Sequence, residues 1–156
     1  MRIVGLGKAG CSLAQAFSKF PQYETVKIDS ERDADVTIKK RDTHEEYDAK
    51  FPSLKRKIKF NNEDIMIIVC GAGKISGGIL RLLEQLQNNR ITILYIQSDL
   101  RLLSEVQKKQ DKIVNNVLQE YARSGVIDAI WLVDNRRVER GIGEVPIMGY
   151  YEVLNQ

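Results

Sequence analysis

The sequence has little histidine and little cysteine. A single histidine, His44, and two cysteines, Cys11 and Cys70, occur among 156 residues. One histidine argues against a histidine-rich zinc site and against Ser-His-Asp catalysis. The cysteines are far apart, and each adjoins a glycine-rich segment, so they are expected to be buried packing residues and not nucleophiles. No disulfide framework is expected, and a reducing cytoplasm is the expected compartment.

Long apolar runs and a strong excess of one charge are lacking too. The longest apolar run, Ile65–Cys70, is far below the roughly 20 residues of a membrane-spanning helix. The opening residues, Met1–Gly5, show no signal-peptide pattern. The net charge of +3, from 24 basic and 21 acidic residues, does not indicate nucleic acid. We expect one cytoplasmic domain over residues 1–156, without nucleic acid and without membrane insertion.

What the sequence does have is an alternation of apolar runs and amphipathic stretches. The expected strands are Arg2–Leu6, Thr25–Asp29, Val36–Ile38, Asp64–Cys70, Thr92–Gln97 and Ala129–Asp134. The expected helices are Cys11–Lys19, Ser76–Leu86 with Ser76 as N-cap, Leu102–Arg123, a modest helix within Ser30–Asn62 and a final helical segment from Pro146. This order predicts an α/β fold, a doubly wound, mostly parallel sheet flanked by helices.

The sequence also predicts which side chains of two helices face inward and outward. Apolar residues at helical intervals assign the inner face of the long helix to Leu102, Val106, Ile113, Val117 and Tyr121. His44, by contrast, is expected on a solvated first helical turn, because its neighbours are polar and charged.

Two glycine-rich loops follow strands of the predicted sheet. The first runs Gly5-Leu6-Gly7-Lys8-Ala9-Gly10-Cys11-Ser12, and the second runs Gly71-Ala72-Gly73-Lys74-Ile75-Ser76-Gly77-Gly78. Ligands of such sheets bind at the carboxyl ends of the strands, beside the point where strand order reverses. Glycines let the backbone approach a phosphate, and a following helix directs its amide groups at the anion. The second loop is not a Walker A sequence, because Ile68 stands where a glycine is required and Ile75 follows Lys74.

These segments, in this order, resemble the nucleotide-binding domain of the FtsZ/tubulin superfamily. The similar segments are Ile3–Ser12 (first phosphate loop), Val26–Ser30 (second strand), Asp64–Gly78 (strand and signature loop), Ala129–Arg136 (strand and guanine-recognising Asn) and Tyr151–Leu154 (start of the central helix). The chain departs from the family where Lys8, Lys74 and Ile75 replace glycines. The loop that senses the terminal phosphate is not recognisable, and the family's catalytic loop, which follows the central helix, is not among these residues.

The resemblance implies a guanine-nucleotide-binding domain of a cytoskeletal, filament-forming protein. Assembly would depend on GTP or GDP with Mg²⁺, and hydrolysis would need a loop from a neighbouring subunit, so no catalytic residue is assigned to this chain. The implied partners are further copies or other tubulin-like subunits. The implied nucleotide-binding residues are Gly7, Lys8, Ala9, Gly10, Cys11, Asp29, Gly71, Ala72, Gly73, Lys74, Ser76, Gly77, Glu105 (ribose), Asn135 (guanine edge), and Tyr150 or Tyr151 (stacking).

Two other functions remain open at the level of sequence. Asp29 lies 19 residues after Gly10, where an NAD-binding Rossmann domain of a dehydrogenase or regulatory sensor has the acid that holds a ribose. Asp29 could equally line a guanine-nucleotide site or cap a helix. The third possibility is a filament-interacting module that uses no nucleotide.

Overall fold

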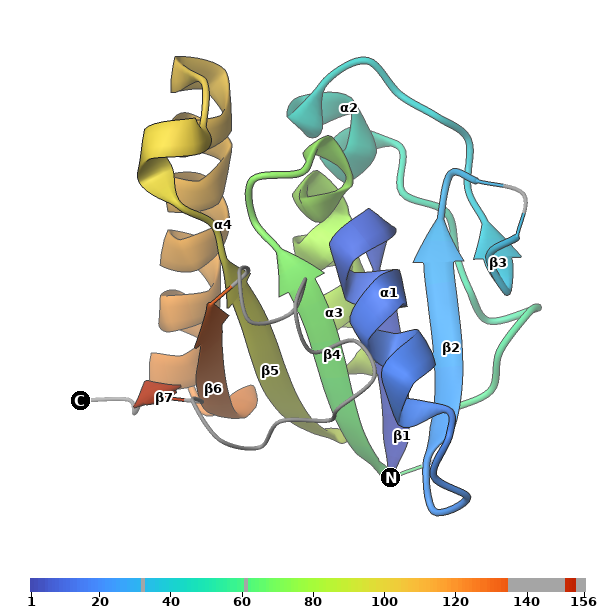
Figure 1. The fold of residues 1–156 in the computed structure, drawn as a ribbon. Coiled ribbons are helices and arrows are strands. Elements are labelled where there is room, and N and C mark those ends of the chain that lie inside the picture. The colour runs from blue at the N-terminus through green and yellow to red at the C-terminus, as the bar shows by residue number, and fades with distance from the viewer. Residues whose placement is uncertain (32, 61, 135–150, 154–156) are drawn as a thin grey trace.

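The fold is a seven-stranded sheet with helices on both faces (Figure 1). A computed structural model describes residues 1–31, 33–60, 62–134 and 151–153. The strands are β1 (Arg2–Leu6), β2 (Glu24–Asp29), β3 (Val36–Thr37), β4 (Asp64–Cys70), β5 (Arg90–Gln97), β6 (Ile127–Asp134) and β7 (Tyr151–Val153). The apolar runs of the sequence therefore form strands close to the predicted bounds.

The strand order is β3-β2-β1-β4-β5-β6-β7. The first six strands are parallel, and β7 pairs with β6 in the antiparallel direction. The chain builds outward from β1 through β2 to β3 and then returns to the other side of β1 with β4. The predicted doubly wound α/β fold is thus confirmed, and its strand order reverses between β1 and β4.

Helices form the two outer layers (Figure 1). They are α1 (Gly7–Phe17), α2 (His44–Ala49), the 3₁₀ helix η1 (Lys74–Gly78), α3 (Ile79–Leu86), the 3₁₀ helix η2 (Leu100–Leu102) and α4 (Glu105–Arg123). Leu13 and Phe17 of α1 pack on one face of the sheet, while Leu82 of α3 and Leu118 of α4 pack on the other. Among the described residues, no helix has the length and apolar character needed to cross a membrane.

Both helices that follow a glycine loop begin elsewhere than predicted. Helix α1 begins at Gly7 and not at Cys11, because Gly7 takes a φ of +80° and turns the chain from strand directly into helix. Helix α3 begins at Ile79, after η1. Ser76 is therefore not its N-cap; the Ser76 hydroxyl instead lies within hydrogen-bond distance of the carbonyl oxygens of Gly71 and Gly73 in the loop.

Helix α4 is rotated relative to the prediction. Its buried residues are Gln110, Val114, Leu118 and Ala122. Two residues of the predicted inner face, Val106 and Ile113, are 61% and 49% exposed, and Leu102 lies before the helix and is 80% exposed. The Tyr95 hydroxyl of β5 donates a hydrogen bond to the Asp111 carboxylate, which holds the helix in this rotation. A capping box between Ser104 and Gln107 sets its first turn.

The region after Pro146 also differs from the prediction. Residues Tyr151–Val153 form β7, which pairs with Ile130–Leu132 of β6, where a helical segment was expected. A strand competes well here because β6 would otherwise be an edge strand with unpaired backbone groups, and β7 satisfies them. The rest of the predicted segment lies outside the described residues.

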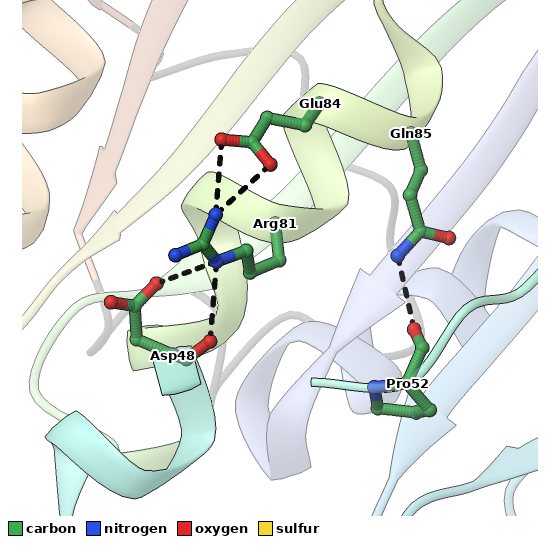
Figure 2. Close-up of polar contacts among 5 residues, drawn as sticks. All are labelled: Asp48, Pro52, Arg81, Glu84 and Gln85. Atoms are coloured by element: carbon green, nitrogen blue, oxygen red, sulfur yellow. Dashed lines mark hydrogen bonds and ion pairs between the residues drawn. The ribbon is translucent and has the colours of Figure 1, made fainter. Parts of the chain in front are cut away.

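The segment around α2 is attached to α3 by polar contacts (Figure 2). The Arg81 guanidinium bonds the backbone oxygen and carboxylate of Asp48 and also the carboxylate of Glu84. Gln85 donates to the carbonyl oxygen of Pro52 and accepts from the amide of Leu54. Exposed ion pairs contribute little each, but together these contacts fix α2 beside the second glycine loop.

The rotation of α4 leads to a stability prediction. Leu118→Ala should lower the free energy of unfolding by about 2–5 kcal/mol, because Leu118 is 1% exposed and its removal leaves a cavity. Ile113→Ala in the same helix is the matched control and should cost less than about 1 kcal/mol. Urea unfolding followed by circular dichroism measures both, and a larger loss for Ile113→Ala would contradict this rotation.

Candidate functional site

The two glycine loops lie at the same edge of the sheet. The first follows β1 and the second follows β4, and these strands are parallel neighbours that pair Leu6 with Val69 at their carboxyl ends. The reversal of strand order falls between them. The structure therefore places both loops at the position where doubly wound sheets bind ligands.

The first loop leads α1 very close to the sheet. A Cβ atom placed on Gly10 would collide with the carbonyl oxygen of Ile68 in β4, and one placed on Gly5 would lie 2.5 Å from the carbonyl oxygen of Gly10. Only glycine permits this approach. Leu6 provides no side-chain cap, and the first turn contains no acidic residue. The amide end of α1 is therefore suited to an anion.

The two loops touch each other. A Cβ atom placed on Gly7 would lie 2.6 Å from Cγ2 of Ile75, so the second loop packs directly against the first turn of α1. Gly73 and Lys74 are exposed at this junction, as is Lys8 in the first loop. Both loops thus carry an exposed lysine near their contact, and the second also exposes the backbone of Gly73.

The other predicted residues of the second loop are buried. Gly71, Ala72, Ser76 and Gly77 have little or no solvent access, and Ser76 is 0% exposed. The Ser76 hydroxyl lies 2.9 Å from the carbonyl oxygen of Gly71 and 2.6 Å from that of Gly73. It therefore holds the loop together and offers no free hydroxyl to a phosphate, unlike the contact expected from the sequence.

A cavity of about 690 Å³ lies beside the first loop, between α1 and the end of β2. Its walls are Lys8, Cys11, Ser12, Gln15, Lys27, Asp29, Glu31, Asp33 and Ala34. Burial raises the pKa of Asp29, the nearby carboxylates of Glu31 and Asp33 raise it further, and the Ser30 amide and Lys8 lower it. A cavity with this lining provides hydrogen-bond acceptors for a hydroxyl-rich group.

Cys11 contributes packing and not reactivity. Its thiol lies 3.4 Å from the carbonyl oxygen of Ile28 and 3.5 Å from that of Gly5. Burial, followed by the charge of Asp29, raises the pKa of Cys11 to about 12. The thiolate is thus suppressed at neutral pH.

A smaller cavity of about 190 Å³ lies at the ends of β5 and β6. Gln97, Ser98, Asp99, Arg101 and Asp134 line it. Asp134 directly precedes Asn135, the residue expected to recognise guanine, but Asn135 and Tyr150 lie outside the described residues.

The remaining predicted residues lie at two other elements. Tyr151 begins β7. Glu105 is exposed on the first turn of α4, where it binds Lys108 at 3.3 Å, and it is not among the residues that line the cavity at β5 and β6.

Sequence reasoning missed the residues that support the second loop. The Tyr95 hydroxyl, bonded to Asp111, occupies the space where a Cβ atom of Gly71 would be. Burial and the bond to Asp111 raise the pKa of Tyr95, so it stays a proton donor. His44 is 6% exposed, not solvated, and its Nε2 atom lies 3.2 Å from the Ser76 hydroxyl. No sequence spacing links these pairs, since only the tertiary structure brings them together.

Comparisons with known proteins do not assign the site. No protein-family model matches the chain, and no curated protein matches it. Within the part of the chain that the structure describes, no three His, Cys, Asp or Glu side chains are grouped so that they could hold a metal ion.

The environment of Cys11 predicts slow thiol chemistry. In a Cys70→Ala variant, Cys11 is the only thiol, and a disulfide reagent at about pH 8 should label it slowly in the folded protein, because little thiolate is present. The same variant unfolded in urea is the control and should react at the rate of an ordinary cysteine. Equal rates in the two states would contradict the buried, protonated thiol.

Proposed function

We propose that this chain is a guanine-nucleotide-binding domain of the FtsZ/tubulin type, acting in GTP-dependent filament assembly. The observation that carries the proposal is the contact between the two glycine loops, Gly7 against Ile75, at the reversal of strand order. A domain that holds one phosphate group needs only one glycine loop. A domain that holds a di- or triphosphate from two sides needs a second loop facing the first.

Exposure and charge at the junction support the same ligand. The amide end of α1 has no side-chain cap and no acidic residue in its first turn, and Lys8, Gly73 and Lys74 are exposed around it. Each of these features favours an anion. Hydrolysis would need groups from a neighbouring subunit, so the chain by itself should bind nucleotide with negligible turnover.

The cavity at the ends of β5 and β6 supports guanine as the base. Asp134 lines it, and Asp134 directly precedes in sequence the Asn135 that the family resemblance assigns to the guanine edge. A nucleotide whose phosphates lie at the loop junction would direct its base across the ends of β4 and β5 toward this cavity.

Lys8 provides the test of phosphate binding. Lys8→Gln should weaken binding of labelled GTP roughly three- to tenfold, because a charge beside the phosphates is lost. Lys19→Gln, beyond the other end of α1, is the matched control and should leave the dissociation constant unchanged. Fluorescence anisotropy measures both. Absence of GTP binding at millimolar nucleotide would overturn the guanine proposal and leave only the fold.

A second candidate, an NAD-binding domain, is favoured by one specific observation. The cavity of about 690 Å³ contains Asp29 at the end of β2, which is where dinucleotide-binding domains hold the adenosine ribose. This function accounts for the first loop and for Asp29. It gives no reason for a second glycine-rich loop.

Asp29→Asn separates the two candidates. If the ligand is GTP with its base toward β6, the substitution should change GTP affinity by less than about twofold. If the ligand is NAD, loss of the ribose acceptor should weaken NAD binding by roughly tenfold or more. Parallel titrations of the unsubstituted protein and the variant with GTP and NAD measure this, and NAD-selective loss would overturn the guanine proposal.

A further inference from the structure

The only histidine of the chain is buried against the second glycine loop. His44 begins α2 and is 6% exposed. Its Nε2 atom lies 3.2 Å from Oγ of Ser76, the residue that closes the loop. No motif in the sequence analysis gives His44 a role at this loop. The proposed nucleotide contacts do not use its imidazole.

The geometry at Ser76 determines whether the Ser76 hydroxyl or Nε2 of His44 donates the hydrogen bond between them. The Ser76 hydroxyl has one hydrogen, yet its oxygen lies 2.6 Å from the carbonyl oxygen of Gly73 and 2.9 Å from that of Gly71. If that hydrogen pointed to His44, both carbonyl oxygens would face a lone pair at hydrogen-bond distance. The hydroxyl therefore donates to a loop carbonyl, and neutral His44 donates from Nε2 to Ser76.

The backbones of α2 and the loop are interlocked as well. A Cβ atom placed on Gly77 would collide with the carbonyl oxygen of His44, and one placed on Gly78 would collide with the ring of Phe51. Arg81 holds Asp48 at the other end of α2 (Figure 2). A shift of His44 would therefore move the loop that presents Gly73 and Lys74.

We propose that His44 is a positioning residue for the second glycine loop, and that protonation of its imidazole displaces the ring from the loop and weakens nucleotide binding. The displacement comes from burial: Nε2 would still donate to Ser76 in the imidazolium, but the added charge would lie in a residue that is 6% exposed. The regulation of binding rests on the proposed function, whereas the hold of His44 on the loop does not. The chain would then bind its nucleotide well at neutral pH and poorly in mildly acidic solution.

The electrostatic surroundings set the direction of the pH effect. Burial lowers the pKa of His44 below 6.5, and Glu45 and Asp48 of α2 raise it partly back. The residue of η1 that faces the ring is Ser76, which carries no charge. The charged residue of α3 on this side is Arg81, which is paired with Asp48. Because the folded pKa is lowered, the contribution of neutral His44 is complete above pH 6.5 and is lost as the pH falls through the folded pKa.

Nuclear magnetic resonance of the nucleotide-free chain tests the contact directly. One imidazole signal is expected, since there is one histidine. Its midpoint should lie below 6.5, and the backbone amide signals of Gly73 and Lys74 should shift with the same midpoint. A midpoint at or above 6.5, or amide signals that do not follow it, would overturn the proposal.

Variants then connect the contact to nucleotide affinity. His44→Leu and Ser76→Ala each remove one partner and should weaken GTP binding roughly five- to tenfold at neutral pH. His44→Gln retains an amide donor that does not titrate, so it should bind within about twofold of the unsubstituted chain and lose the additional weakening below pH 6.5. Asp42→Asn, exposed before α2, is the charge control and should change neither affinity nor pH dependence.

The two proposals fail in different ways. If no variant and no pH change affects GTP affinity while the unsubstituted chain binds GTP, His44 has no positioning role and the proposed function stands. If the chain does not bind GTP at all, the guanine proposal fails, and the resonance titration alone decides whether His44 holds the loop.

Discussion

The site depends on one close approach, that of α1 to β4. Gly10 brings the first turn of the helix against the carbonyl oxygen of Ile68, with no room for a side chain. The left-handed turn at Gly7 starts the helix immediately after β1. A side chain at either position would push the amide end of α1 away from the reversal of strand order and away from Ile75. The contact between the two loops follows from this approach.

The two loops contribute differently to the proposed anion site. The first exposes the uncapped amide end of a helix, while the second directs its hydroxyl and most of its residues inward. The second loop therefore depends on what lies beneath it. Tyr95 and Asp111 support Gly71, and His44 supports Ser76. Residues from β5, α2 and α4 thus determine the shape of a loop that follows β4.

The sequence predicted what depends on local pattern and missed what depends on tertiary contacts. Continuous apolar runs marked β1 and β4 because parallel strands covered on both faces have few polar residues. The glycines after them marked the two loops that meet at the reversal of strand order. The rotation of α4 was not predictable, because two stripes of apolar residues compete and the Tyr95–Asp111 bond decides between them. The burial of His44 was missed for the same reason: its partner, Ser76, is 32 residues away.

The two candidate ligands share the phosphate site and differ in the direction of the base. The cavity at β2 carries the carboxylates of Asp29, Glu31 and Asp33, which repel phosphate but accept bonds from sugar hydroxyls. The cavity at β5 and β6 is lined by Asp134, the last residue of β6. Because a dinucleotide also lies across the reversal of strand order, the second loop does not by itself separate the two ligands. The position of the base does: toward the carboxylates at β2 for the adenosine of a dinucleotide, and toward the ends of β5 and β6 for the proposed guanine nucleotide.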